Sequence, residues 1–192
     1  MIELNPIDGA VPPASGKHAV MLQKEKTFSP HVLAIQAGSV VDFPNADPIF
    51  HNAFSSYNGQ VFDIGLYPPA STRSVRFARQ GVVRVFCNIH ASMSALIVVV
   101  GSPYFATTKP DGTFSIAGVP EGRYNLSVFH ERASDATLSE LSRKITVGAD
   151  GASLSPIAIS EAGYLSIPHK NKYGRDYSPE SGDQATYPGA KR

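Results

Sequence analysis

The chain has 192 residues, with 17 Lys and Arg against 16 Asp and Glu, and a formal net charge of +1. That balance excludes a protein that binds nucleic acid through a strongly basic face, because such a face must neutralise phosphates. The single cysteine, Cys87, excludes a disulfide framework. No run of 18 or more apolar residues is present, so the sequence predicts no transmembrane helix.

Frequent Gly and Pro residues, 16 and 15 of them, separate short apolar stretches, which is typical of an all-β protein. The chain begins with the apolar alternation of a strand at Ile2 and Leu4, followed by a turn-rich loop at 5–16. Further patterning predicts strands at 18–22, 28–35, 40–43, 51–55, 74–77, 82–87 and 95–100. Strands at this spacing predict a β-sandwich, and we assign residues 1–101 to this first domain.

The pattern changes at Ser102-Pro103. Strands are predicted at 113–116, 123–129, 145–147 and 155–160, and a helical turn within the polar residues 133–144. We therefore expect a second, smaller β-sandwich domain at 103–165. Residues 166–192 have little hydrophobic patterning, and we expect an arm across another surface up to about Tyr177 and disorder beyond it.

Residues 86–93 carry the chemistry of this sequence. They place a thiol, an imidazole and a thioether three residues apart, at Cys87, His90 and Met93, where an apolar strand ends. Because side chains alternate along a strand, Cys87 faces the core if the valines two and four residues before it do. His51 starts another strand after a Pro-bounded loop. A thiolate, two imidazoles and a weak axial thioether are the ligands of a blue-copper electron-transfer site.

The pattern Pro44-Asn-x-Asp-Pro48, His51-Asn52 and Cys87-x-x-His90-x-x-Met93 resembles the cupredoxins over roughly residues 18–100. The resemblance implies a Greek-key cupredoxin β-sandwich whose one copper ion, bound by His51, Cys87, His90 and Met93, cycles between Cu(I) and Cu(II). It also implies that Asn52 and Asn88 support the ligands, with Asn52 tying its strand to the Cys87–Asn88 turn. The short ligand loop is similar to that of amicyanin, but it lacks the prolines of the amicyanin loop.

These features predict a periplasmic carrier of single electrons between transient protein redox partners. The electron would leave through the ring edge of His90, and partners would dock on a small apolar rim made by Pro48, Ile49, Phe50 and Ala91. The first residues, 1–6, lack the basic start and apolar core of a signal peptide. Taken literally, this indicates a cytoplasmic protein. Because the sequence begins partway through a predicted first strand, at Ile2 and Leu4, we instead expect an exported protein whose signal peptide is missing from this chain or removed.

Two wider resemblances concern the rest of the chain. The order of its two predicted domains resembles bacterial exported proteins described as methylamine-utilisation proteins. Residues 103–165 resemble the regulatory-type sandwich that follows some carboxypeptidases, through Asp111-Gly-Thr-Phe and Val119-Pro-Glu-Gly-Arg-Tyr. This resemblance implies a structural domain without a peptidase active site.

Several alternatives stay open at this point. Cys87 on its own is typical of a buried structural cysteine, the site could take zinc, and Met93 could be an ordinary core residue. The protein could be a copper carrier or store without redox turnover, a copper enzyme such as a nitrite reductase, or an envelope interaction protein with structural copper. We predict no enzyme, because paired carboxylates, a Gly-x-Ser-x-Gly motif and a phosphate loop are missing from the sequence. His31 and His130 are interpreted as a rim and a turn residue, and His169 either as part of a solvated tail or as a contact to an acidic partner.

Overall fold

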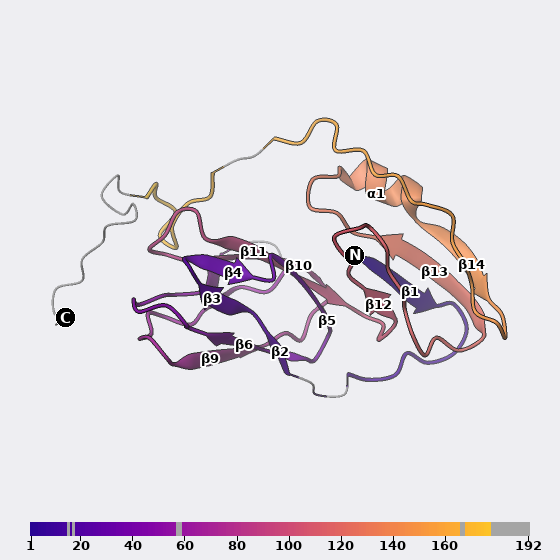
Figure 1. The fold of residues 1–192 in the computed structure, drawn as a ribbon, viewed down its shortest axis with the longest axis horizontal. Helices are drawn as coiled ribbons and strands as arrows, with labels where there is room; N and C mark the ends of the chain where they lie inside the picture. Colours follow the sequence, from indigo (N-terminus) through magenta and orange to yellow (C-terminus); the bar gives the residue numbers. More distant parts are fainter. Residues whose placement is uncertain (15, 17, 57–58, 166–167, 178–192) are drawn as a thin grey trace. The chain divides into compact units, whose positions relative to one another are not determined.

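The computed structural model describes the chain except for residues 15, 17, 57–58, 166–167 and 178–192. The described residues form fourteen strands and one short helix, which confirms the predicted all-β fold class (Figure 1). No described helix has the length and apolar character needed to cross a membrane. The elements are β1 (Ile2–Pro6), β2 (His18–Val20), β3 (Leu22–Lys24), β4 (Thr27–Ser29), β5 (Val32–Gln36), β6 (Val40–Pro44), β7 (Phe54–Ser55), β8 (Phe62–Asp63), β9 (Thr72–Arg76), β10 (Gly81–Phe86), β11 (Ser94–Val100), β12 (Phe105–Ala106), β13 (Gly122–Val128), α1 (Asp135–Leu141) and β14 (Arg143–Val147).

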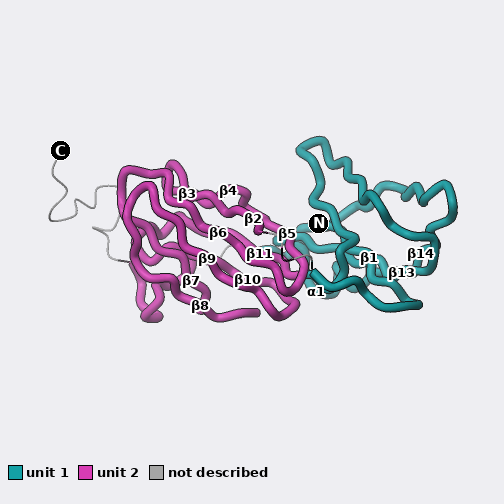
Figure 2. The backbone as a smooth tube through the Cα atoms, turned by 90° about the horizontal axis from the view of Figure 1, so that it is seen from below, with its two compact units in different colours: residues 1–15, 100–167 teal, residues 16–99, 168–192 magenta. Residues whose placement is uncertain are grey.

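The chain folds into two compact units, drawn in teal and magenta in Figure 2. Unit 1 contains residues 1–15 and 100–167, and unit 2 contains residues 16–99 and 168–192. This division differs from the predicted domains 1–101, 103–165 and 166–192. Strand β1 pairs with β13, with Ile2 opposite Val128 and Leu4 opposite Leu126, so the N-terminal strand belongs to unit 1. The alternation of Ile2 and Leu4 identifies a strand, but it carries no information about the strand with which it pairs.

Unit 1 is built on a four-stranded sheet in the order β12-β1-β13-β14. Its core includes Leu4 and Leu126. The predicted strands at 113–116 and 155–160 have no regular secondary structure, although Phe114 and Ile157 still pack their side chains against the core. Helix α1 lies within the predicted helical segment 133–144, and the Ser134 side chain caps it by accepting the amide of Thr137.

Unit 2 contains a five-stranded sheet, in the order β5-β11-β10-β7-β8, and a three-stranded sheet, in the order β2-β6-β9. A two-stranded sheet, β3-β4, completes it. The two larger sheets contribute to one buried cluster, which includes Val41 and Phe43 from β6 and Val85 and Ile97 from β10 and β11. Two sheets that share one core make the sandwich that was predicted for this part of the chain.

Strand pairing brings two segments that are distant in sequence to one end of this sandwich. Strands β10 and β11 pair antiparallel up to Phe86 opposite Ser94, so residues 87–93 form the short loop between them. Strand β7 pairs with the same end of β10, with Phe54 opposite Phe86. His51, three residues before β7, forms an isolated bridge with Tyr67. The segment that carries His51 therefore lies beside the loop that carries Cys87 and His90.

Candidate metal centre

Cys87, His51 and His90 direct their ligand atoms to one point. Cys87 Sγ lies 3.6 Å from His90 Nδ1 and 3.9 Å from His51 Nδ1, and the three atoms all lie within 4.8 Å of one another. Bonds of about 2.3 Å from sulfur and about 2.0 Å from nitrogen to a shared ion, at angles between tetrahedral and trigonal, separate the two atoms by about 3.5–3.7 Å. The separation of Cys87 Sγ from His90 Nδ1, 3.6 Å, lies within that range, and its separation from His51 Nδ1, 3.9 Å, is slightly wider, so a small inward movement of one ring lets these donors share a metal ion.

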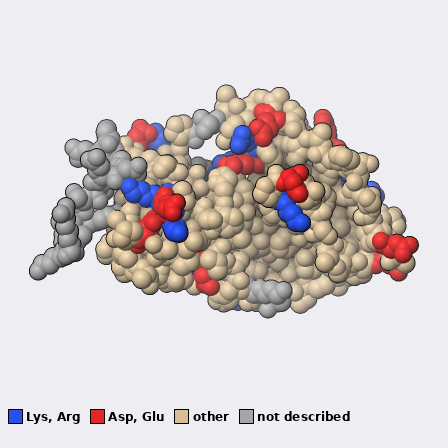
Figure 3. Space-filling view, viewed as in Figure 1, with Lys and Arg blue, Asp and Glu red and all other residues tan. Residues whose placement is uncertain are grey.

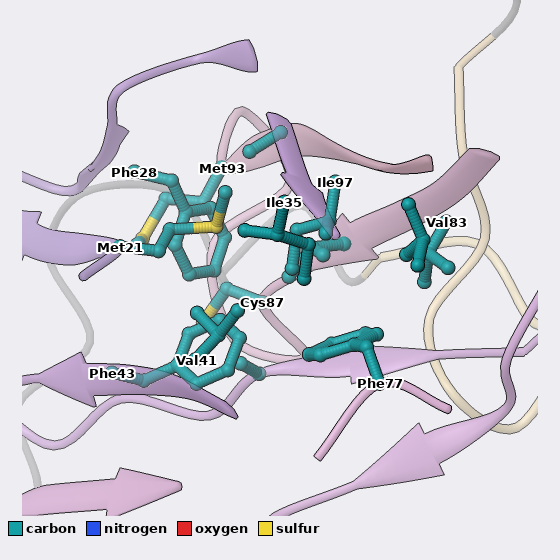
Figure 4. Packing of buried hydrophobic residues seen from close by; sticks show 14 of the residues in the cluster. Met21, Phe28, Ile35, Val41, Phe43, Phe77, Val83, Cys87, Met93 and Ile97 are labelled. Carbon is teal, nitrogen blue, oxygen red and sulfur yellow. The ribbon is translucent and has the colours of Figure 1, made fainter. Parts of the chain in front are cut away.

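The cluster is enclosed by the core of unit 2. His51 and Cys87 are fully buried, and His90 and Met93 are nearly so. Figure 4 shows Cys87 and Met93 among the apolar side chains of this core. The Cys87 amide donates to the Met93 carbonyl at 3.1 Å, and the Met93 amide donates to the His90 carbonyl at 3.1 Å, which folds the loop back on itself. Met93 is thus placed in the same cluster as Cys87, which agrees with an axial ligand and with a core side chain alike.

Asp47 fixes the orientation of the His51 ring. Its Oδ2 lies 2.7 Å from His51 Nε2, on the side of the ring opposite the Nδ1 that faces Cys87. The same carboxylate accepts the backbone amides of Glu25 at 2.7 Å and Lys26 at 2.9 Å, so it is itself held in place. A carboxylate partner on the second ring nitrogen is typical of metal-binding histidines, because it sets which nitrogen is free. Asp47 belongs to the motif Pro44-Asn-x-Asp-Pro48, but no role was predicted for it; the available signal was a carboxylate four residues before His51 in a Pro-bounded turn.

Burial is the main influence on the ionisation of both ligands. It raises the pKa of the Cys87 thiol, while backbone hydrogen bonds from Ile89, Asn52 and His90 act in the opposite direction. Burial lowers the pKa of His51, against the effect of Asp47. His51 is therefore neutral near pH 7, which is the form that binds metals, and a metal would replace the proton of the thiol.

Burial alone would raise the pKa of the Asp47 carboxyl group. Hydrogen bonds from the Lys26 amide, His51 and the Glu25 amide outweigh burial and hold this pKa below its usual value. The carboxylate is therefore charged at neutral pH. A charged acceptor stabilises the proton on His51 Nε2 and leaves Nδ1 free to bind a metal.

The two asparagines expected to support the ligands are linked indirectly. Asn52 Nδ2 donates to Asp63 Oδ1 at 2.8 Å, and Asn88 Oδ1 accepts the Lys172 amide at 3.0 Å. Lys172 Nζ in turn donates to Asp63 Oδ2 at 2.8 Å. The Asn52 backbone amide hydrogen-bonds the Cys87 thiol directly, and the two asparagine side chains are linked through Asp63 and Lys172. Local sequence could not reveal this, because Lys172 lies 84 residues from Asn88.

The other predicted residues lie at the surface. Of the predicted docking rim, Pro48, Phe50 and Ala91 are exposed and Ile49 is partly buried. His31 and His130 lie outside the Cys–His–His cluster. The site also includes two residues that the sequence analysis did not single out as site residues, Asp63 and Lys172.

No family model matches the chain, and no curated protein is similar to it. Among solved structures, it is similar to a copper-containing nitrite reductase from Thermus scotoductus, with a TM-score of 0.42 and 20% identity over 50% of this chain and 25% of that chain. A purple cupredoxin from Nitrosopumilus maritimus gives a TM-score of 0.39 and 23% identity over 43% of this chain and 99% of that chain. A reduced amicyanin variant gives a TM-score of 0.41 and 16% identity over 52% of this chain and 98% of that chain. The metal site is inferred from its own geometry and not from these likenesses.

Proposed function

We propose that unit 2 is a cupredoxin domain in which His51, Cys87, His90 and Met93 bind one copper ion. We further propose that the protein carries single electrons between redox partners in the periplasm. The observation that supports this most strongly is the Cys–His–His cluster, whose sulfur-to-nitrogen separations of 3.6 and 3.9 Å are close to those expected around a shared ion, inside an apolar core. Copper held by such ligands exchanges one electron between Cu(I) and Cu(II).

The surrounding residues are suited to electron transfer because they hold the ligands in place. Asp47 fixes the His51 ring, and the Cys87 amide is bound by the Met93 carbonyl. Backbone hydrogen bonds from Asn52 and Ile89 favour the Cys87 thiolate. Ligands that are fixed in this way move little when the charge of the centre changes, and burial keeps water away from it.

The surface favours transient contacts. On the face shown in Figure 3, basic and acidic side chains lie in small groups of both signs, in keeping with the net charge of +1. We therefore propose that partners dock on the rim of Pro48, Ile49, Phe50 and Ala91 rather than through a strong charged field, with His90 as the exit for the electron. The expected relations of residues 103–165 to carboxypeptidase regulatory domains, and of the chain to methylamine-utilisation proteins, stay predictions.

The test is to add Cu(II) to the purified protein and to follow its visible spectrum and its reversible reduction. We expect one copper per chain, a strong thiolate-to-copper band, and loss of that band in Cys87→Ser. A matched pair of core variants, Met93→Leu and Met21→Leu, tests the axial ligand, because both methionines are buried in the same cluster. Only Met93→Leu should shift the band and the reduction potential.

Other outcomes would contradict the proposal. A wild-type protein without the band does not contain this copper site. Tight Cu(I) binding with irreversible reoxidation would instead indicate a copper carrier or store. More than one copper per chain would indicate an enzyme of the nitrite reductase type.

A further inference from the structure

The C-terminal arm, residues 168–177 (yellow in Figure 1), lies against the ligand loop of unit 2. Tyr177 Oη donates to the Cys87 carbonyl at 2.6 Å, across 90 residues of sequence. The His169 ring stacks on Phe86, with ring centroids 4.1 Å apart and an interplanar angle of 24°. Tyr177 packs edge-on against the same His169 ring at 5.1 Å. The arm therefore contacts the chain at Cys87 and at the residue immediately before it.

The contact from Tyr177 completes the hydrogen bonding of Cys87. The Cys87 amide is bound inside the loop by the Met93 carbonyl, and the Cys87 carbonyl is bound from outside by Tyr177. Both backbone polar groups of the ligand residue are thus fixed. Buried backbone groups require such partners, so loss of the Tyr177 hydroxyl would leave the Cys87 carbonyl without this donor.

Lys172 adds a second anchor that reaches both ligand segments. Its amide donates to Asn88 beside Cys87, and its ammonium donates to Asp63, which also accepts the Asn52 side chain beside His51. The Lys172 side chain is only 25% exposed, so this ion pair is partly shielded from water. One residue of the arm therefore connects the segment of His51 to the segment of Cys87.

We infer that the arm is a clamp on the metal site and that Tyr177 and Lys172 are positioning residues for Cys87 and His51. The clamp holds the 87–93 loop closed and restricts access to the Cys87 thiol. This arrangement of the protein does not depend on copper. Only the effect on the reduction potential, described below, rests on the proposed copper function. A hydrogen bond donated to the Cys87 carbonyl would lower the electron density at this residue, which would favour the reduced state of a copper ion held there.

The first test uses the metal-free, full-length protein and measures the rate at which a thiol reagent modifies Cys87. A hydrogen bond of ordinary strength would make Tyr177→Phe react about fivefold faster, which corresponds to about 1 kcal/mol. Lys172→Met should also accelerate the reaction, because it removes the ion pair to Asp63 and leaves the backbone contact to Asn88. Tyr164→Phe makes the same chemical change in unit 1 and should react at the wild-type rate.

The second test compares the reduction potentials of the copper-loaded proteins. Tyr177→Phe should have a lower potential than wild type, and Tyr164→Phe should not. Unchanged thiol reactivity in both Tyr177→Phe and Lys172→Met, with native circular dichroism, would overturn the clamp. If Tyr177→Phe fails to fold, Lys172→Met decides the question alone. If wild type binds no copper, the proposed function fails, but the thiol rates still test the clamp.

Discussion

The carboxylate of Asp47 offers the sharpest test of how the site is built. Its two oxygens accept three hydrogen bonds, from the Glu25 amide, the Lys26 amide and His51 Nε2. In Asp47→Asn an amide NH2 group replaces one carboxylate oxygen. Because each oxygen accepts at least one hydrogen bond, this NH2 group must face at least one of these donors and cannot accept from it. A hydrogen bond to a charged group contributes about 1.5–3 kcal/mol, and a buried donor left without a partner costs about 1–3 kcal/mol. We therefore expect unit 2 to lose about 2 kcal/mol of stability.

The same substitution should weaken metal binding. Removing a carboxylate that orients a metal-binding histidine typically lowers the affinity about 10- to 100-fold. Stability is measured on the metal-free protein by hydrogen exchange of the β10 and β11 amides, which reports unit 2 separately, and affinity by competition with a copper chelator. The control is Asp42→Asn, which alters a carboxylate 2.8 Å from His18, whose side chain is 58% exposed. It should cost less than about 1 kcal/mol and leave the affinity unchanged. Equal effects of the two variants would refute the role given to Asp47.

Two further predictions concern stability. Gly59 has a φ of +72°, and an added Cβ would lie 2.7 Å from the Val82 carbonyl oxygen, so Gly59→Ala should destabilise unit 2 by more than about 2 kcal/mol in urea denaturation. Gly65→Ala, at a φ of +68° with open space around it, should cost only about 1 kcal/mol; equal losses would contradict the steric reasoning. Burial lowers the pKa of His169 below its usual 6.5, so the unfolded chain takes up a proton at this residue at a higher pH than the folded protein does. The contribution of the neutral His169 ring to the free energy of unfolding is therefore fully present above pH 6.5 and is lost as the pH falls from 6.5 towards the folded pKa. The stability of metal-free protein should therefore decline between pH 7 and 5, less steeply in His169→Gln, and identical slopes would contradict this assignment.

The sequence predicted the parts of the site that depend on short-range spacing. Cys87 and His90 lie in one loop between paired strands, so their separation in sequence determined their closeness in space. His51 was also predicted, because it follows the Pro-bounded loop of the motif Pro44-Asn-x-Asp-Pro48 and His51-Asn52. The all-β class followed from alternating residues and frequent turns.

The parts that depend on long-range pairing could not be predicted. The partner of β1 is set by tertiary packing, and the contacts of Lys172 and Tyr177 span 84 and 90 residues. Segments 113–116 and 155–160 have the apolar alternation of strands and use it to pack against the core, but they form no ladder. Alternation reports which side chains are buried, and it does not report whether a neighbouring strand is available to pair with.

The loop that carries the ligands contains no proline, and the arm supplies contacts that can stiffen it from outside. Residues 88–92 are Asn, Ile, His, Ala and Ser, so none of them restricts its own backbone as proline would. A proline in a compatible position stabilises a fold by about 0.4–1 kcal/mol, and one hydrogen bond contributes about as much. The contacts of Tyr177 with Cys87 and of Lys172 with Asn88 are therefore of the right size to replace that stiffness. Stiffness supplied from outside the loop can be removed one contact at a time, which makes the rigidity of this site separable from the identity of its ligands.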